Sequence, residues 1–309
     1  MNVWVTGGAG FLGSHLVEAL AARGDAVTVV DDFSTGALAN LAACASRVSI
    51  CRMNLLSAAL RMELASARPR VIFHLAGDAL VSRSVADPLG DCERNMLSTL
   101  KLLEAVRAES PESKVLFAST GAVYGDNAAK PFTEADTLAP ISPYAVAKLA
   151  AERYCFAYAR TFGLHTCSLR LFSVYGPRQK KQVVYDLIRK LHAAAGEIEV
   201  YGDGTQERDF SHAANIVDAF LLAAEHAPFH GEAINVAGNE IITIHELISR
   251  LCALMNKSPG IRYTGERRPG DSQRWIADTS VLGAMGFTPR VQLTAGLRDT
   301  IDWYIRQLE

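Results

Sequence analysis

The sequence lacks the features that mark several large classes of protein. No apolar run approaches the roughly 18 residues needed to cross a bilayer, and no block of basic residues indicates a nucleic-acid partner. Because a run typical of a first strand already begins at Val3, we expect no signal peptide. These absences predict a cytoplasmic protein that binds neither membranes nor nucleic acids.

Cysteine is scarce and scattered. The chain has six cysteines and no C-x-x-C pair, so neither a zinc site nor a disulfide framework is expected. The histidines, among them His74, His212 and His245, also lack the spacing of metal ligands. We therefore expect reduced cysteines that serve in packing, and no bound metal.

The chain is long and rich in apolar residues. Its 309 residues are 49% apolar and carry a net charge of −2, which suffices for one large or two modest domains with a buried core. Up to about residue 172, short β-branched runs alternate with longer helical patterns. This predicts an α/β fold with a Rossmann-type doubly wound parallel sheet over residues 1–172. A smaller mixed α/β domain over residues 173–309, with returns to the sheet allowed, would close over the carboxyl ends of the strands.

Individual elements follow from the same patterns. We expect strands near residues 48–51, 71–75, 115–119 and 166–171. We expect helices over residues 88–109 and near residues 183–194, 214–226, 245–255 and 293–308.

The most informative stretch is VTGGAGFLG near the N-terminus, where a buried strand runs through a glycine turn into a helix. Gly7 can adopt a tight turn, Gly10 lets the main chain approach a phosphate, and Gly13 lets the helix pack closely on the strand. The helix N-terminus adds N–H groups and a positive dipole end. Asp31 follows the next strand 18 residues after Gly13, close to the roughly 20 expected for a ribose-binding carboxylate. Since Asp31 would repel a 2′-phosphate, the pattern favours NAD over NADP.

A second pattern predicts acid–base chemistry. A helix starting at Pro143 would place Tyr144 and Lys148 on one face. A lysine cation close to a phenol favours the phenolate, which would lower the tyrosine pKa from its ordinary ~10 so that it can take a proton from a sugar hydroxyl. Thr120, at the end of a predicted strand, could hydrogen-bond the same oxygen.

Together these stretches resemble the extended short-chain dehydrogenase/reductase family, specifically the NAD-dependent nucleotide-sugar epimerases and dehydratases. The matching runs are TGGAGFLGSHL, VVDDFSTG, HLAG, ASTGAVYG, SPYAVAK, RLFSVYGPRQ, YGDGTQERDF and RRPGD. The resemblance implies oxidation of a UDP-linked sugar at C4 by tightly held NAD, which is regenerated at the end. It also implies a homodimer formed through the helices near residues 88–109 and 143–161.

The resemblance assigns a role to individual residues. The catalytic residues it implies are Tyr144, Lys148 and Thr120. The implied cofactor contacts are Gly7, Gly10, Phe11, Leu12, Gly13, Asp31, Asp32, Asn54, Leu75, Ala76, Gly77, Asn95, Tyr144 and Lys148, with Asn54 where the family usually has an aspartate. The implied substrate contacts are Thr120, Ser173, Arg208, Arg268 and Asp271, with the two arginines clamping the diphosphate and Asp271 touching the nucleoside ribose.

The outcome of the reaction stays open at this stage. Gly121 and Ala122 stand where 4,6-dehydratases carry an Asp-Glu pair, and neither can transfer a proton. The small pair resembles epimerases, which favours 4-epimerisation of a UDP-hexose or UDP-N-acetylhexosamine. The chain departs from the epimerase pattern in three places: Ser173 replaces the usual Asn, the loop after Gln179 is short, and Trp275 lies where epimerases have a residue that gates a C2 N-acetyl group.

Asp78 supports a second hypothesis. It follows the HLAG run, near the expected nicotinamide, where epimerases do not usually have a carboxylate. If it acts as an acid or base, the enzyme would resemble the UDP-N-acetylglucosamine 5,6-dehydratase of tunicamycin assembly; otherwise Asp78 is an exposed loop residue. An NAD-binding regulator without turnover is a third hypothesis, because fold does not fix function, but the intact Tyr144, Lys148 and Thr120 argue against it.

Overall fold

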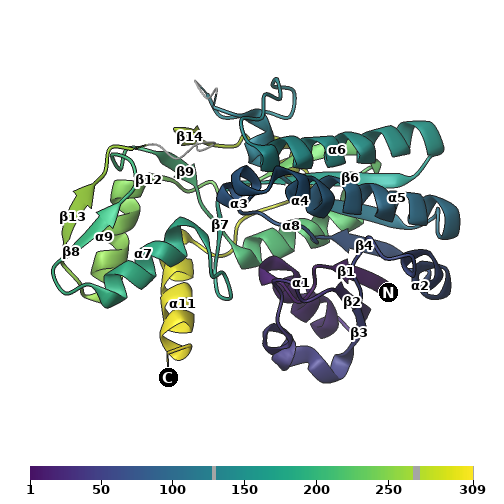
Figure 1. Cartoon of the computed structure of the whole chain (residues 1–309), viewed down its shortest axis with the longest axis horizontal. Coiled ribbons are helices and arrows are strands. Elements are labelled where there is room, and N and C mark those ends of the chain that lie inside the picture. Colours follow the sequence, from purple (N-terminus) through teal and green to yellow (C-terminus); the bar gives the residue numbers. More distant parts are fainter. Residues whose placement is uncertain (127–129, 267–271, 309) are drawn as a thin grey trace.

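The computed structural model describes residues 1–126, 130–266 and 272–308. Its centre is a seven-stranded sheet with the order β11-β6-β5-β4-β1-β2-β3, in which all neighbouring strands run parallel. These strands are β1 (Asn2–Thr6), β2 (Ala26–Asp31), β3 (Val48–Arg52), β4 (Val71–His74), β5 (Lys114–Thr120), β6 (His165–Leu171) and β11 (His230–Val236). The strand order reverses between β1 and β4 (Figure 1), which confirms the predicted doubly wound sheet.

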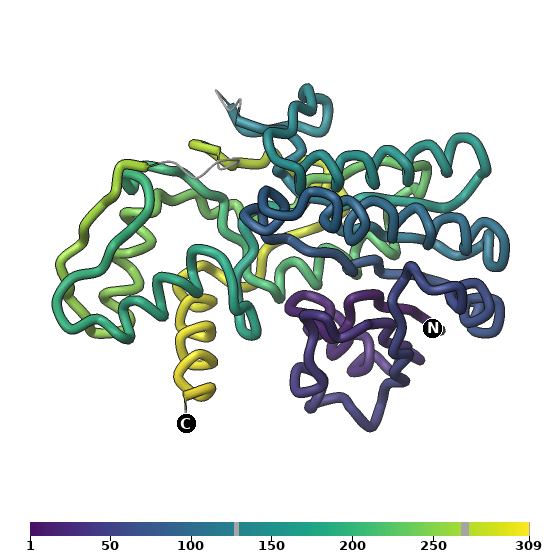
Figure 2. Tube along the Cα trace, viewed as in Figure 1, coloured from purple at the N-terminus to yellow at the C-terminus, as the bar shows by residue number. Residues whose placement is uncertain are grey.

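Helices cover both faces of this sheet, as the trace in Figure 2 shows. On one face lie α1 (Phe11–Ala22) and α8 (Ala213–His226); on the other lie α2 (Leu60–Ala67), α5 (Ser98–Glu109) and α6 (Pro143–Phe162). Successive residues of β1 serve the two faces, since Val3 and Val5 pack with α1 whereas Trp4 packs with α5. Burial on both sides explains the unbroken apolar runs in the sequence.

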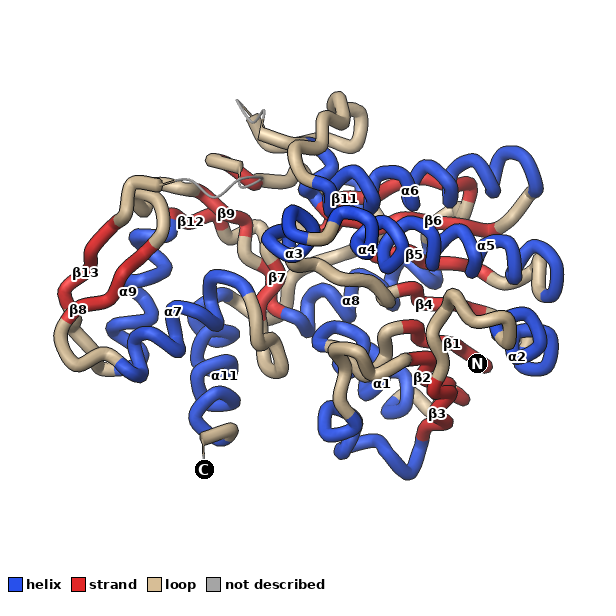
Figure 3. Tube along the Cα trace, viewed as in Figure 1, coloured by secondary structure: helices blue, strands red, loops and turns tan. Residues whose placement is uncertain are grey.

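A smaller lobe lies beside the carboxyl ends of the strands (Figure 1). It holds a three-stranded sheet with the order β12-β9-β14 and the strand pairs β13-β8 and β10-β7. Its strands are β7 (Val174–Tyr175), β8 (Glu197–Val200), β9 (Glu207–Asp209), β10 (Ser211–His212), β12 (Ile241–Thr243), β13 (Gly260–Tyr263) and β14 (Arg274–Trp275). The lobe contains three helices, blue in Figure 3: α7 (Gln182–Ala193), α9 (Ile244–Met255) and α11 (Leu293–Arg306). Their apolar side chains form a core of its own.

The chain returns to the large sheet after it first enters the smaller lobe. The helix α8 contacts α1, and β11 extends the sheet beside β6. The helix α10 (Ser280–Ala284) then contacts β11. Residue 172, the expected boundary, is therefore where the chain first crosses into the smaller lobe, and later segments also belong to the sheet.

Several short elements complete the fold. The helix expected over residues 88–109 consists of α4 (Pro88–Cys92), the π-helical segment η2 (Glu93–Leu97) and α5. Three further helical segments were not predicted from the sequence: α3 (Val81–Ala86), η1 (Leu38–Arg47) and η3 (Gly121–Tyr124). None of the helices described is both long and apolar enough to cross a membrane. The described side chains also contain no cluster of His, Cys, Asp and Glu suited to a metal ion.

Candidate active site

A cavity of about 1110 Å³ lies between the carboxyl ends of the sheet and the smaller lobe. Its walls come from the glycine turn, from the ends of β2, β4 and β5, from α6 and from the strand and helix surfaces of the smaller lobe. Most of the expected site residues line it: Gly7, Gly10, Phe11, Leu12, Gly13, Asp31, Asp32, Asn54, Leu75, Ala76, Gly77, Asp78, Asn95, Thr120, Tyr144, Lys148, Ser173 and Arg208. Arg268 and Asp271 lie outside the described residues. This reaction cavity is the candidate active site.

The glycine turn leaves no room for side chains. Gly7 has φ +69°, and a Cβ atom there would lie 2.7 Å from the Ala76 nitrogen. A Cβ atom on Gly13 would lie 2.1 Å from the Gly7 carbonyl oxygen. Among the described residues, no side chain caps the first turn of α1. The N–H groups of that turn therefore face the cavity without competition from a cap, as a phosphate site requires.

Two carboxylates at the end of β2 face the same part of the cavity. Asp31 accepts hydrogen bonds from the backbone N–H groups of Ala9 (2.9 Å) and Phe33 (2.8 Å). Burial raises its pKa, although both bonds act in the opposite direction. Asp32 accepts a bond of 2.8 Å from the Asn54 side chain. Asp31 thus fastens the glycine turn to β2, a role that the sequence pattern did not indicate.

This donor set fits NAD. The turn offers backbone N–H groups and closely approaching glycines to a pyrophosphate, and the two carboxylates offer acceptors to ribose hydroxyls. The wall beyond the turn continues to Thr120, Tyr144 and Lys148. A dinucleotide bound along this wall would reach from Asp32 to the candidate acid–base residues.

The candidate acid–base residues come from two elements that meet at the cavity. Thr120 ends β5, and α6 begins at Pro143, as predicted, with the Ser142 hydroxyl accepting from the Ala145 N–H at 3.2 Å. Tyr144 and Lys148 lie one turn apart and are 8% and 5% exposed. The Lys148 ammonium lies 4.2 Å from the centre of the Phe117 ring. Both reactive groups are therefore largely shielded from water.

Burial decides the pKa values of this pair. Burial raises the pKa of Tyr144 to about 12, outweighing a hydrogen bond with Thr120 that lowers it. Burial also lowers the pKa of Lys148 to about 8. The expected net lowering of the Tyr144 pKa is therefore wrong in direction, because the cost of burying a charge outweighs any lowering by the nearby lysine.

Asp78 is not an exposed loop residue. Its side chain is 4% exposed and is paired with Arg83 (2.9 Å) and Lys181 (3.5 Å). Its backbone is held by Asn95, whose amide oxygen accepts from the Asp78 N–H and whose amide nitrogen donates to the Asp78 carbonyl, each at 3.1 Å. Lys181 belongs to the smaller lobe, so Asp78 joins the two walls of the cavity. Asn95 contributes by fixing this loop.

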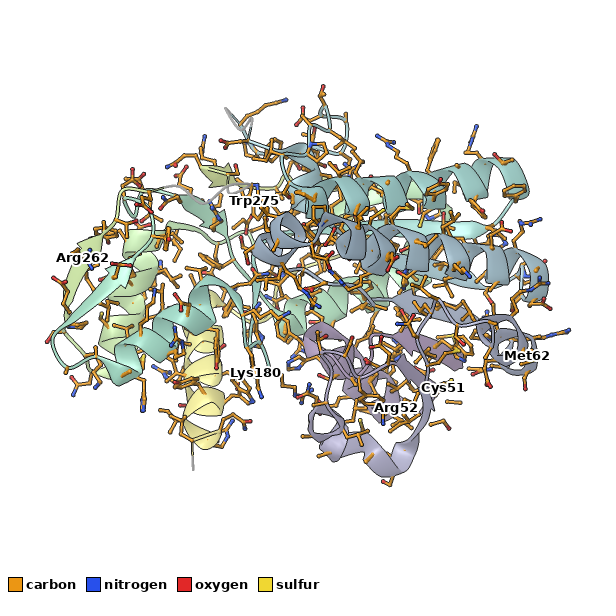
Figure 4. All side chains as sticks on the ribbon, viewed as in Figure 1. Cys51, Arg52, Met62, Lys180, Arg262 and Trp275 are labelled. Atoms are coloured by element: carbon orange, nitrogen blue, oxygen red, sulfur yellow. The ribbon has the colours of Figure 1, made fainter. Side chains whose placement is uncertain are left out.

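The smaller lobe supplies the opposite wall. Arg208 donates to the carbonyl oxygens of Glu207 (2.9 Å) and Gln273 (3.3 Å), and its guanidinium lies 5.4 Å from the centre of the Trp275 ring. Trp275 also packs against the apolar cluster of Ala122, Tyr144 and Ala145. Figure 4 shows Trp275 where this lobe meets the helices over the sheet. A large ring thus forms part of the cavity wall.

One contact between the lobes was not predicted from the sequence. Arg178 donates to the Ser14 hydroxyl at 3.0 Å and to both carboxylate oxygens of Glu18 at 2.6 and 2.7 Å. Both partners lie on α1, the helix that follows the glycine turn. Lys180, in the same segment, lies between the lobes in Figure 4. The GPRQ run in the sequence was the available signal, but its partners are about 160 residues away.

Comparisons with known proteins agree with this geometry. The family described as the NAD dependent epimerase/dehydratase family matches residues 3–237. The UDP-glucose 4-epimerase of Mycolicibacterium smegmatis is 33% identical, with 98% of each chain covered. The UDP-N-acetylglucosamine 4-epimerase of Methanobrevibacter ruminantium, solved with UDP-N-acetylmuramic acid, is 35% identical with a TM-score of 0.91, covering 99% of this chain and 98% of that one. The dTDP-glucose 4,6-dehydratase of Streptomyces venezuelae, solved with NAD, is 30% identical with a TM-score of 0.93, covering 99% of this chain and 97% of that one.

Proposed function

Because this chain belongs to the NAD dependent epimerase/dehydratase family, we propose that it catalyses 4-epimerisation of a UDP-linked hexose or N-acetylhexosamine. The family makes it an NAD-dependent enzyme that acts on a nucleotide sugar. The observation that supports epimerisation is the wall around Thr120, Tyr144 and Lys148, which holds one acid–base group for C4 and none beside it at positions 121 and 122.

The residues of this wall divide the work of a reversible oxidation. Tyr144 takes the proton of the sugar 4-hydroxyl and later returns it to the oxygen at C4. Thr120 hydrogen-bonds the same oxygen, and the Lys148 ammonium favours the anionic form of the phenol. NAD, when bound along this wall, would supply the hydride acceptor and donor for C4, and its positively charged ring would favour the same phenolate. Inversion at C4 would require the oxidised sugar to present its other face to the same wall.

The fold itself argues against 4,6-dehydration. A side chain at position 121 would have its Cβ atom 2.7 Å from the ring of Phe172. The space that an aspartate would need is therefore filled by a buried aromatic ring. Ala122, the next residue, is 4% exposed and carries no titratable group. Elimination across C5 and C6 would lack its acid and base at these two positions.

A 5,6-dehydratase is the second candidate because of Asp78. This carboxylate lines the reaction cavity on the loop that follows β4, near the expected position of the nicotinamide. It is buried and already paired with Arg83 and Lys181. Its position supports elimination, whereas its two ion pairs support a structural role, so epimerisation ranks first.

Proton NMR of the reaction mixture tests the proposal. UDP-glucose and UDP-N-acetylglucosamine would each be incubated with the enzyme. We expect the H4 coupling pattern of at least one sugar to change from that of an axial to that of an equatorial proton. Vinyl signals would instead establish the 5,6-dehydratase, and would overturn the epimerase assignment.

We infer that the enzyme forms a homodimer through the continuous helical stretch of α4, η2 and α5 and through α6, as the family resemblance implies. Supporting this, apolar side chains along these helices are exposed, with Leu89 82%, Val146 53% and Phe156 44% accessible, as is Ile141 (48%) just before α6. A shallow apolar groove lined by Pro88, Met96 and Val146 lies between them. Light scattering should give about twice the chain mass.

A further inference from the structure

Three polar residues form a row across the sheet beneath α6. Ser119 of β5 is the register partner of Arg170 of β6, and Arg170 is the register partner of Asn235 of β11. Register partners on neighbouring strands share a face of the sheet. All three are buried, with 3%, 3% and 0% of their surfaces exposed. A polar row in this position is unusual, because the surrounding face packs apolar side chains of α6 and α5.

Glu152 of α6 completes this row. Arg170 donates to its two carboxylate oxygens, with nitrogen–oxygen distances of 3.0 and 2.6 Å. The Ser119 hydroxyl donates to the same carboxylate at 2.7 Å. Both charged side chains are 3% exposed. The contact is therefore a buried two-pronged ion pair with a third hydrogen bond.

The remaining nitrogen of the Arg170 guanidinium also has hydrogen-bond partners. Its guanidinium donates to the Tyr124 hydroxyl at 2.6 Å, and that hydroxyl donates to the Asn235 amide oxygen at 2.8 Å. The Asn235 amide nitrogen donates to the Phe132 carbonyl at 2.9 Å. The guanidinium thus has no freedom to move, and it fixes whatever it binds on α6.

This network lies next to the reacting groups. Ser119 directly precedes Thr120, and Glu152 follows Lys148 by one helical turn and Tyr144 by two. Residues four apart share a helix face, so the ion pair holds the same face of α6 that presents the phenol and the ammonium. The function proposed above does not use Glu152 or Arg170.

We propose that Glu152 and Arg170 are a positioning pair for the reaction: they fix the reactive face of α6 against the end of β5 and hold balanced charges beside the Lys148 ammonium. The inference rests on the proposed function only in giving Lys148 a catalytic role. Buried ion pairs often contribute little net stability because both charges lose their hydration. Placement of a nearby reactive group is a better reason for this pair.

Neutralising one or the other member of the pair should shift the pKa of Lys148 in opposite directions. The charged and titratable groups around Lys148 are Tyr144, Glu152 and Cys155 of α6, Asp91 of α4 and His74 of β4. Glu152→Gln would leave the Arg170 cation buried without its partner, and should lower the pKa of Lys148. Arg170→Gln would leave the Glu152 anion without its partner, and should raise it.

The experiment titrates Lys148 directly. Lysine side chains labelled with ¹³C would be followed by NMR against pH, with the Lys148 signal assigned by its loss in Lys148→Arg. We expect shifts of about half a pH unit or more in opposite directions for the two single variants, and a value near wild type for Glu152→Gln with Arg170→Gln. The alkaline limb of kcat should move in the same two directions. We also expect kcat to fall ~10-fold or more in each single variant, with KM changed by less than ~3-fold.

Glu104→Gln is the matched control. Glu104 accepts hydrogen bonds from Arg107 and from Tyr158 of α6, away from the reaction cavity. This variant should leave the Lys148 titration and kcat unchanged. Circular dichroism would verify that each variant is folded.

Several results would overturn the proposal. One is a pair of folded single variants whose Lys148 pKa values move in the same direction or not at all. If the single variants do not fold, the double variant decides. A wild-type kcat in the double variant, which lacks the ion pair, would exclude a positioning role. The titration needs neither NAD nor a sugar, so opposite shifts in an enzyme that converts no UDP-sugar would refute the proposed function and leave the charge balance at Lys148 intact.

Discussion

Tyr144 and Lys148 show how burial reverses the usual order of two pKa values. The tyrosine rises to about 12 and the lysine falls to about 8, whereas in water the lysine is the weaker acid of the two. The protein's own groups therefore favour a neutral phenol. For Tyr144 to act as the proposed base near neutral pH, a bound cation beside the phenol would be needed, which would link proton transfer to occupancy of the cofactor site.

The role of Tyr144 can be tested by removing one oxygen. Tyr144→Phe should bind NAD and UDP as wild type does, because the ring keeps its packing, but should lose more than ~100-fold in turnover, the usual scale for an acid–base group. Steady-state kinetics and calorimetric binding would measure both. Tyr154→Phe, on the exposed side of the same helix, is the control. Turnover unchanged in the Tyr144 variant would remove this residue from the mechanism.

The positions of single residues at the cavity were predictable where the sequence signal is local. Asp31, the last residue of β2, was predicted from its spacing to Gly13, and Tyr144 and Lys148 from their separation by one turn. The ion pairing of Asp78 was not, because one of its partners, Lys181, lies 103 residues away. The pKa of Tyr144 was predicted in the wrong direction, because neighbouring charges are visible in a sequence and the extent of desolvation is not.

At the scale of elements, α6 was predictable from its ends. Ser142 caps it, Pro143 occupies its first turn, and Gly163 ends it with φ +70°. What the helix contacts was not predictable. The pairing of Glu152 with Arg170 requires α6 to pack over β6 and the Arg170 side chain to lie on the face of the sheet that α6 covers. Only the assembled sheet determines this arrangement.

The start of α1 allows a test at this scale. In Gly13→Ala the added Cβ atom would lie 2.1 Å from the Gly7 carbonyl oxygen and 2.7 Å from the Gly8 Cα, and backbone cannot move aside as a flexible side chain can. We expect a loss of about 1–3 kcal/mol in unfolding free energy. We also expect NAD affinity to fall ~10-fold or more, because the turn that approaches the phosphates must shift. Urea unfolding and calorimetric NAD binding would measure the two effects.

Gly283→Ala is the control for this substitution. Gly283 lies in α10, and a Cβ atom there would meet nothing within 4 Å. The alanine should leave NAD binding unchanged and should stabilise the helix slightly, by about 0.5–1 kcal/mol. If Gly13→Ala lowered neither the unfolding free energy nor the NAD affinity, the close packing of α1 on the glycine turn would not be required.

At the scale of the whole molecule, the two lobes meet through histidines that stay neutral. Burial lowers the pKa of His15 to about 4 and that of His212 to about 4. The His15 ring contacts the Pro177 carbonyl at 2.9 Å, which joins α1 to the segment entering the smaller lobe. His74, fully buried between Thr6 and Thr99, has its pKa lowered to about 3 by burial. Protonating any of these rings in the folded protein would bury a charge, although the Asp299 carboxylate lies 3.3 Å from the Nε2 atom of His212.

These three rings predict acid sensitivity. Between pH 6 and pH 5 the unfolded chain binds a proton at each imidazole, whereas the folded chain binds almost none, so stability falls as pH falls. Asp209 acts in the opposite direction, because burial raises its folded pKa to about 6 and the folded chain then binds a proton that the unfolded chain does not. The net uptake on unfolding is roughly two protons, or about 2–3 kcal/mol of lost stability per pH unit.

Urea unfolding at pH 7, 6 and 5 would measure this dependence. In His15→Gln the slope should be smaller by about 1.4 kcal/mol per pH unit, since one proton fewer is taken up on unfolding. His226→Gln, at an exposed position on α8, should keep the wild-type slope. A stability that stays constant from pH 7 to pH 5 would show that the histidines at the junction of the lobes are charged in the folded enzyme. In that case the junction could not be the neutral, tightly packed contact that holds the smaller lobe over the reaction cavity.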